Sequence, residues 1–439
     1  MSRRSDNAEG LYIAPADLQI GMFVRLETGW TNHPFPFNNF RIKDERQLKL
    51  LQKLGLDRIL LDPARCDSAV RSDALSAARS LMLINAEAAA VEAEPVAVSA
   101  PPSVPELDQA IAAKRERIGR LVRQRELMDE CERRFLSAAR QVTSISKNIF
   151  AAPEQTVEKA TAFVHGLVDS LDKYAEVHIH LMNNKLNTRE VYDHSLNVTS
   201  LSLVLGQRMG FSNQELCHLG LGCVFHDLGK GELPEKVAKK IGPLSGLERE
   251  VLQMHVDHSM QICIKLGLPV DALNVIAQHH EMVDGSGYPR GLGQHSMSKL
   301  AKVAALVNAF DNLCNPANAT TGLTPHDALK VLFARERERY DPDTLNAFIR
   351  VIGIYPPGTL VRLNNGSIGM VLSVNVEKSL KPTVLVYEAG VARHEAIVLE
   401  LSEQSEYSIE RGVQREELSV DAAAYLNPRR RIAFFHGDS

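Results

Sequence analysis

The chain has 439 residues, 44% of them hydrophobic and 24% charged, which fits a soluble globular protein but exceeds the size of one compact core. Lys and Arg total 50 against 54 for Asp and Glu, a net charge of -4, so the basic excess expected of a protein that binds polymeric nucleic acid is missing. No segment approaches the roughly 20 continuous apolar residues of a membrane span, and no signal-peptide run follows the N-terminus. We therefore expect a cytoplasmic protein of two or three domains.

The six cysteines lack CxxC spacing, which predicts buried thiols in a reducing compartment.

The first 86 residues are expected to form a small α+β regulatory module. Alternating residues such as Met22–Leu26 favour short strands, and a helical pattern runs from Asp44 to Leu54. Residues 87–105 then contain mainly Ala, Val, Glu, Pro and Ser. These residues bury too little side chain to pay for ordering the backbone, so this segment is predicted to be a disordered linker.

Residues 106–154 are predicted to form an amphipathic helical connector, because apolar residues recur there at roughly helical spacing among dense charges. The heptad is irregular, so a coiled-coil contact in a homodimer and packing within the same domain both stay open. Residues 155–355 have an almost wholly helical pattern. After residue 356 the pattern changes to a period of two with a hairpin turn at Asn365-Gly366, which predicts a small β appendage and a tail over 356–439.

Candidate metal ligands gather in the helical block. Two adjacent pairs, His226-Asp227 and His279-His280, each follow an apolar helical run. A carboxylate beside an imidazole can bridge two ions, although a capped helix end is the alternative interpretation of the first pair. The four-residue spacing of Glu190 and His194 places both on one helical face, but such a pair is more often a surface charge contact.

Three strings in this block closely resemble the signature of HD-GYP domains, a branch of the HD metal-dependent phosphohydrolases. They are His226-Asp-Leu-Gly-Lys230, His279-His-Glu281 and Asp284-Gly-Ser-Gly-Tyr-Pro-Arg-Gly-Leu292, in the family order. The stretch from Leu18 to Phe35 is similar to the uncharacterised module that often precedes this domain in bacteria. The resemblance implies a mainly α protein, with an all-helical HD-type phosphohydrolase core between the two small terminal modules.

The resemblance also implies two or three divalent metal ions. One ion would be held by His194, His226 and Asp227, and a second by Asp227, His255, His279 and His280. Glu190 matches an added ligand of members with a third metal, and Asn308 stands where the family has an aspartate ligand. Mixed nitrogen and oxygen ligands suit iron, manganese or zinc better than calcium, and we expect iron or manganese.

The expected chemistry is phosphodiester hydrolysis. Two neighbouring cations can activate water and bind a phosphodiester, with Asp227 as their shared ligand. Lys230, one helical turn away, is placed to neutralise charge on phosphate oxygens, and a solvated lysine is the alternative. From the resemblance to HD-GYP domains we predict that cyclic di-GMP is opened to pGpG, with GMP as a further product left open.

A glycine-rich loop follows the second histidine pair. In the family this loop is linked to substrate binding and to contact with diguanylate cyclase (GGDEF) domains. The residues concerned are Asp284, Gly285, Gly287, Tyr288, Pro289 and Arg290. Its glycines can take positive φ and let backbone approach a ligand or partner closely, while a purely structural turn is the alternative.

Two positions depart from the family pattern. Asn308 lacks the negative charge of the aspartate, so metal affinity there should fall, and Asp311 is expected to lie too far along the helix to replace it. The arginines that follow in the family are replaced by Pro316–Thr320. These departures favour a second hypothesis, a degenerate sensor or scaffold that binds a cyclic dinucleotide or a cyclase with little turnover. A third is hydrolysis of another cyclic dinucleotide, because specificity lies in pocket shape.

Overall fold

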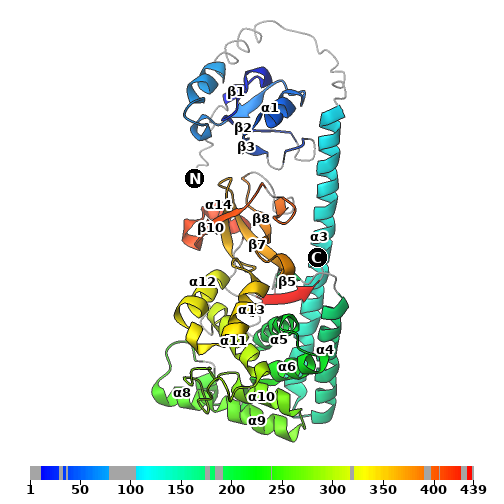
Figure 1. Ribbon diagram of the computed structural model, residues 1–439, viewed down its shortest axis with the longest axis vertical. Coiled ribbons are helices and arrows are strands. Elements are labelled where there is room, and N and C mark those ends of the chain that lie inside the picture. Colours follow the sequence, from blue (N-terminus) through cyan, green and yellow to red (C-terminus); the bar gives the residue numbers. More distant parts are fainter. Residues whose placement is uncertain are drawn as a thin grey trace, which may run out of the picture. The chain divides into compact units, whose positions relative to one another are not determined.

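The computed structural model describes residues 11–28, 33–35, 38–78, 105–173, 178–182, 191–238, 240–316, 321–389, 397–404, 406–426 and 433–437. The chain divides into two compact units, Met1–Arg123 and Gln124–Ser439 (Figure 1). Of the predicted linker at 87–105, only Pro105 lies within the described residues, and Glu190 lies outside them. Among the described helices, none has both the length and the apolar character needed to cross a bilayer.

The N-terminal unit contains a four-stranded antiparallel sheet. Its strands are β1 (Leu11–Ile13), β2 (Phe23–Arg25), β3 (Asn39–Arg41) and β4 (Ile59–Leu61), in the order β1-β4-β2-β3. Helix α1 (Glu45–Gln52) begins after Asp44, whose carboxylate accepts a hydrogen bond from the backbone of Gln47 at 2.8 Å. Apolar side chains of the sheet and of α1 share one core, which confirms the predicted small α+β module.

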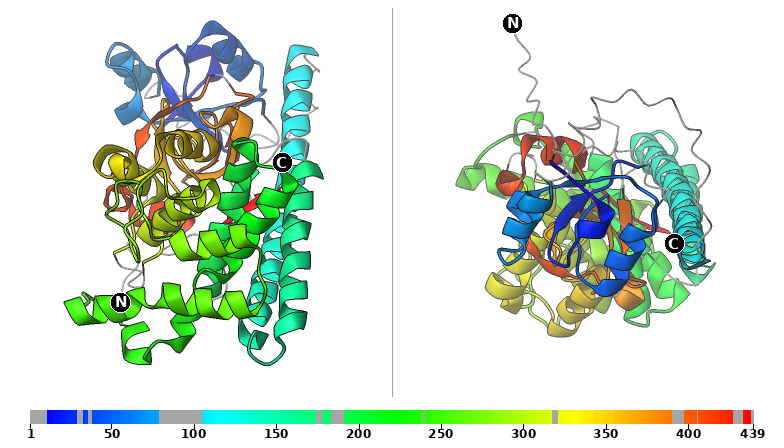
Figure 2. Two further views of the ribbon diagram at one scale, coloured as in Figure 1. Left: turned by 60° about the horizontal axis from the view of Figure 1, so that its bottom comes forward. Right: turned by 90° about the horizontal axis from the view of Figure 1, so that it is seen from above.

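The second unit is mainly helical, as predicted. Its helices are α3 (Pro105–Asn148), which begins in the first unit, α4 (Pro153–Lys173), α5 (Val191–Arg208), α6 (Asn213–Phe225), α7 (Glu235–Ala238), α8 (Gly246–Gln253), α9 (His255–Lys265), α10 (Val270–Gln278), α11 (Lys299–Cys314), α12 (Pro325–Lys330), α13 (Pro342–Ile352) and α14 (Val420–Leu426). In both views α3 and α4 lie side by side (Figure 1, Figure 2). From Cys131 onward α3 packs into the same core as the other helices, and all six cysteines are buried and free of disulfides.

Helix α6 lies at the centre of this core, because apolar side chains cover most of its faces. It begins at a capping box in which Ser212 and Glu215 exchange hydrogen bonds. Two glycines allow its neighbours to approach closely. A Cβ on Gly220 would lie 2.5 Å from Val164 of α4, and a Cβ on Gly222 would lie 2.5 Å from Val275 of α10. The position of the C-terminal end of α6 is therefore tightly fixed.

A seven-stranded sheet completes the second unit. Its strands are β5 (His178–Met182), β6 (Leu360–Leu363), β7 (Ile368–Asn375), β8 (Thr383–Val386), β9 (Ile397–Glu400), β10 (Ile409–Gly412) and β11 (Ala433–Gly437). The order is β10-β6-β7-β5-β11, and β8 pairs with both β7 and β9. The predicted Asn365-Gly366 turn joins β6 to β7, and Gly366 has φ +82°. Strand β5 was not predicted, because its partners β7 and β11 come from much later in the sequence.

Candidate metal centre

His226 and Asp227 directly follow α6, and both side chains are buried. The backbone here packs against α9 without a gap, since a Cβ on Gly229 would lie 2.1 Å from the carbonyl oxygen of His255. Ser259 connects the two segments: its hydroxyl donates to the carbonyl of His226 and accepts from the backbone nitrogen of Gly229, both at 2.8 Å. This contact fixes the predicted ligand His255 beside Asp227.

Three histidines share one local arrangement. Nδ1 of His226, His255 and His279 lies 2.7, 2.6 and 2.7 Å from the carbonyl oxygen three residues earlier. Because a carbonyl oxygen only accepts hydrogen bonds, Nδ1 must carry the proton, and Nε2 keeps its lone pair. Each ring therefore presents an unprotonated nitrogen to the space around Asp227, as a metal ligand must.

His194, on the first turns of α5, is oriented by another helix. Its Nδ1 lies 2.6 Å from Oδ2 of Asp311 on α11. The carboxylate accepts a hydrogen bond from Nδ1, so Nε2 is the ring nitrogen of His194 that faces the centre, 3.3 Å from Nε2 of His226. Asp311 thus orients the candidate ligand His194 by accepting a hydrogen bond from Nδ1, the ring nitrogen that does not face the centre. This arrangement is common in metal sites.

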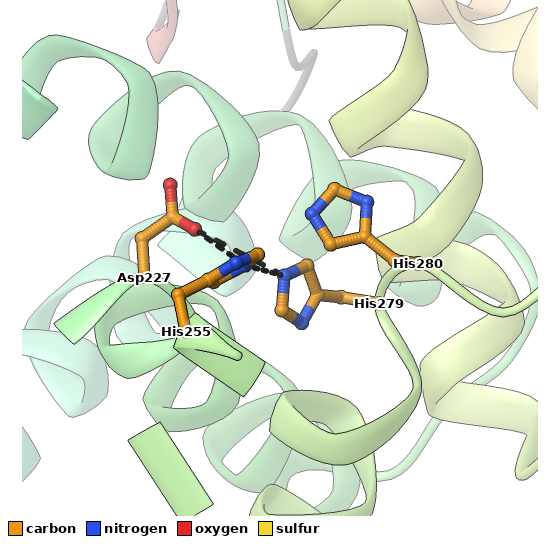
Figure 3. Close-up of side chains that lie close together, drawn as sticks. All are labelled: Asp227, His255, His279 and His280. Carbon is orange, nitrogen blue, oxygen red and sulfur yellow. Dashed lines mark hydrogen bonds and ion pairs between the residues drawn. The ribbon is translucent and has the colours of Figure 1, made fainter. Parts of the chain in front are cut away.

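Asp227 lies between two groups of histidines, and Figure 3 shows it with one of them, His255, His279 and His280. Its Oδ1 is 3.4 Å from Nε2 of His255 and 3.9 Å from Nε2 of His279. Its Oδ2 is 3.5 Å from Nε2 of His226 and 3.8 Å from Nε2 of His194. The donor atoms form two groups whose members lie within 4.8 Å of one another: Asp227, His255, His279 and His280; and His194, His226 and Asp227. These are the two sets that the sequence predicted, and they share Asp227.

The donor set fits divalent metal ions. Oδ1 of Asp227 is buried and has no hydrogen-bond donor among the described residues. Nε2 of His255 lies 3.3 Å from Nε2 of His279, and neither atom carries a proton, so two lone pairs face each other. A cation shared by these atoms would remove both the unpaired acceptor and the lone-pair repulsion.

Protonation states at the centre also suit metal binding. Burial lowers the pKa of His226 to about 4 and holds the pKa of His279 and His280 well below the usual value. Burial opposes ionisation of Asp227, but Lys230 and the neighbouring histidines outweigh it and hold the pKa of this carboxyl well below its usual range. At neutral pH these three imidazoles are therefore neutral and the carboxylate of Asp227 is ionised.

Lys230 lies at the edge of the centre, as expected from its spacing. Its Nζ donates to Oδ2 of Asp227 at 2.5 Å, and 30% of the side chain is exposed. The ammonium group is therefore beside the shared carboxylate and still accessible from outside. Such a position suits a cation that contacts an incoming phosphate.

The loop after His280 folds back onto the histidines. The ring of Tyr288 stacks on His280 with centroids 4.5 Å apart, and its backbone nitrogen donates to the carbonyl of His280 at 3.1 Å. Only glycine fits at residue 287, since a Cβ there would lie 2.4 Å from the backbone nitrogen of Met282. Asp284, Gly285, Pro289 and Arg290 are exposed on the outer part of the loop.

Two carboxylates have roles that the sequence did not assign. Glu281 is fully buried and accepts hydrogen bonds from the backbone of the glycine-rich loop, and Asp311 orients His194. Glu281 has a sequence signal, because it lies between two ligands and a glycine-rich loop. For Asp311 the only signal in the sequence is its position three residues after Asn308 on the same helix.

Asn308 is buried beside the centre. Its Nδ2 donates to the carbonyl of His279 at 3.4 Å, and its Oδ1 accepts from Asn312 at 3.0 Å. Asp311 is not a member of either donor group.

His258 is half-buried and also lies outside the two donor groups found among the described residues. The predicted ligand Glu190 is not among the described residues.

Comparison with known proteins agrees with this geometry. The HD domain family matches residues 174–344, and a domain of unknown function (DUF3391) matches residues 12–160. The chain therefore carries an HD domain behind a DUF3391 module. Both matches bear out the family resemblance that the three motifs and the N-terminal stretch showed in the sequence.

Three relatives illustrate the range of the family. The chain is 27% identical to the cyclic di-GMP phosphodiesterase PA4108 of Pseudomonas aeruginosa over 85% of this chain and 84% of the relative. It is 24% identical to a cyclic di-GMP phosphodiesterase of Thermotoga maritima, over 47% of this chain and 55% of the relative. It is also 24% identical to the 3'3'-cGAMP-specific phosphodiesterase 3 of Vibrio cholerae, over 51% of this chain and 47% of the relative.

Proposed function

We propose that this protein is a metal-dependent phosphodiesterase that hydrolyses cyclic di-GMP and so lowers the concentration of this second messenger. The observation that carries the proposal is the position of Asp227, whose two oxygen atoms face two different groups of histidines. Such a shared carboxylate is typical of two-metal sites that cleave phosphate esters. A relative that is similar over most of both chains is a cyclic di-GMP phosphodiesterase.

The residues of the centre would have different roles in catalysis. His194, His226 and Asp227 would hold one metal ion, and Asp227, His255, His279 and His280 a second; we expect iron or manganese. When bound, the metals supply Lewis acidity toward phosphate oxygens and lower the pKa of water. The carbonyl oxygens behind the histidines keep Nε2 unprotonated, and Lys230 would donate to a phosphate oxygen.

The first product of this chemistry would be linear pGpG, because opening the ring requires cleavage of one of its two phosphodiester bonds. A second cleavage would give GMP. Because the proposed substrate is an intracellular messenger, we expect the activity in the cytoplasm. The exposed residues of the loop, Asp284, Gly285 and Arg290, would be available to a substrate or to a GGDEF domain. A homodimer through α3 stays one of two open alternatives, beside packing of this helix within its own chain.

A degenerate sensor is the second candidate function, and Asn308 is the observation that favours it. Its amide lies against the carbonyl of His279 where the family pattern has a charged ligand. Fewer negative charges beside two dications would lower metal occupancy and turnover. The third candidate, hydrolysis of another cyclic dinucleotide, is supported by the relative from Vibrio cholerae.

One preparation can separate these candidates. The purified chain is loaded anaerobically with Fe²⁺ or with Mn²⁺, metals per chain are counted, and cyclic di-GMP and 3'3'-cGAMP are supplied in parallel with chromatographic detection of products. Conversion of cyclic di-GMP to pGpG that stops when a chelator is added is the expected result. Binding of cyclic di-GMP without turnover would establish the sensor, and faster cleavage of 3'3'-cGAMP would establish the third candidate.

A further inference from the structure

The support of His194 differs from that of the other ligands. His226, His255 and His279 are each held by a carbonyl group three residues earlier in the chain. His194 instead depends on Asp311, which lies on a different helix and 117 residues away in sequence. Its orientation therefore depends on tertiary packing between α5 and α11.

Asp311 is itself held by other side chains. Its Oδ1 accepts hydrogen bonds from Nδ2 of Asn197 and Nδ2 of Asn315, both at 2.9 Å, while Oδ2 accepts from His194. The carboxylate is completely buried, so these three donors replace the water that would otherwise solvate its charge. Removing any one of them would loosen the carboxylate.

Asn197 extends this network to strand β11. Its Oδ1 accepts a hydrogen bond of 3.0 Å from the backbone nitrogen of Phe434, which is 237 residues away in sequence. A continuous chain of hydrogen bonds thus runs from the backbone of β11 through Asn197 and Asp311 to Nδ1 of His194. The first two donors, the backbone nitrogen of Phe434 and Nδ2 of Asn197, point toward Asp311, and Nδ1 of His194 donates to the same carboxylate from the other side.

Strand β11 is firmly seated among the helices. Phe434, Phe435 and His436 are all buried. The ring of Phe434 lies 5.8 Å from the ring of Phe310, the neighbour of Asp311 on α11. His436 bonds to Ser200 of α5, at 2.9 Å from Nδ1, and its backbone nitrogen donates to the same hydroxyl at 3.2 Å. The strand therefore positions α5 and α11 together.

We propose that β11 forms part of the metal centre's support, and that Asn197 and Asp311 are positioning residues that orient His194 for metal binding. The inference rests on the metal site of the proposed function, but it concerns affinity for the metal rather than the identity of the substrate. It assigns a role in the site to a strand that contributes no ligand among the described residues. Loss of a supporting contact of this kind lowers metal affinity roughly 10- to 100-fold.

The test is titration of the metal-free full chain with Mn²⁺, following heat of binding and metals per chain. Asn197→Leu keeps the size of the side chain and removes both of its hydrogen bonds in the network. Ser200→Ala is the matched control, because it removes hydrogen bonds between the same helix and the same strand without touching Asp311. We expect one Mn²⁺ equivalent to bind roughly 10- to 100-fold more weakly in Asn197→Leu and unchanged in Ser200→Ala.

A second pair of variants tests the strand itself. Phe434→Pro removes the backbone N–H that donates to Asn197. Phe434→Leu keeps this N–H group and replaces only the aromatic ring by a smaller apolar side chain. Thermal unfolding of all four variants shows whether each is folded. Weaker Mn²⁺ binding in Phe434→Pro than in Phe434→Leu is the expected order.

The inference is overturned if Asn197→Leu binds Mn²⁺ as the unmodified chain does, or if Ser200→Ala loses as much affinity, since the contact would then be structural only. Failure of the proposed function looks different. In that case the unmodified chain binds Mn²⁺ and the variants keep the expected order, but cyclic di-GMP is not hydrolysed.

Discussion

The carboxylate of Glu281 accepts hydrogen bonds from the backbone nitrogen of Arg290 at 2.7 Å and from that of Leu292 at 2.8 Å. Glu281 directly follows His279 and His280 and is fully buried. One side chain therefore closes the glycine-rich loop onto the segment that carries two candidate metal ligands. The position of the loop and the position of these histidines depend on the same residue.

We expect Glu281→Gln to loosen this loop without emptying the metal site. The amide group replaces one acceptor with a donor, so one buried N–H group loses its partner, at a cost of about 1 to 3 kcal/mol. Stacking of Tyr288 on His280 should weaken, and KM for cyclic di-GMP should rise more than kcat falls. Steady-state kinetics and metal analysis check this, and a variant that loses its metals would show that Glu281 supports the ligands instead.

Asp227→Ala should remove most bound metal and all detectable hydrolysis, because both donor groups lose their shared member. The helical fold should remain, since the packing around α6 is apolar. Metals per chain, circular dichroism and product formation are measured together. Asp257→Ala, an exposed carboxylate on α9, is the control and should behave as the unmodified chain. Full activity of Asp227→Ala would exclude the metal mechanism.

Lys230→Met should keep its metals and lose roughly 10²-fold in kcat, as happens when a single donor to a developing negative charge is removed. The variant keeps an apolar chain of similar length and loses only the ammonium group beside Asp227. Lys236→Met, on the exposed helix α7, is the matched control. Turnover that stays unchanged in Lys230→Met would mean that this lysine does not contact the substrate.

Asn308→Asp should raise both metal occupancy and turnover. The new carboxylate would place an oxygen in the position from which Nδ2 now donates to the carbonyl of His279. Two facing oxygen atoms repel each other, so the metal-free variant should unfold at a lower temperature, and a bound cation should reverse this. Asn346→Asp, on an exposed position of α13, adds the same charge away from the centre and is the control. Equal metal content in all three chains would remove the main support for the sensor.

His436 should make the fold sensitive to acid. Burial lowers the pKa of this histidine to about 4, whereas its pKa in the unfolded chain is about 6.5. Between these values the unfolded chain binds more protons, so the free energy of unfolding falls as pH drops from about 6.5 toward 4. At pH 5 the loss is about 2 kcal/mol relative to pH 7.

His436→Gln should therefore show a smaller difference in the free energy of unfolding between pH 7 and pH 5. Glutamine can still exchange hydrogen bonds with Ser170 and Ser200, which now contact the ring at 3.1 and 2.9 Å. Urea denaturation of both chains at the two pH values measures the difference. An identical pH dependence would show that His436 does not titrate on unfolding.

The sequence was informative where the chemistry is local. The ligand pairs at His226-Asp227 and His279-His280 follow helices whose apolar pattern is plain, and the β6–β7 turn has its Asn-Gly signal. The boundary between the two compact units was harder to place, because it falls inside helix α3 and no break in the helical pattern marks it. Contacts across hundreds of residues have no local signal, which is why β5, β11 and the link from Asp311 to His194 could not be predicted.

The partner strands of β5 have a consequence for biosynthesis. A ribosome delivers the described ligands, from His194 to His280, long before it delivers β7, and β11 follows later still. Strand β5, which precedes α5, is without its neighbours during this interval, and closing such long loops is slow. Nascent chains can therefore collect the ligand histidines on helices before the hydrogen bond from Phe434 to Asn197 exists. Full maturation of the centre should follow the emergence of β11 from the ribosome, not the emergence of the ligands.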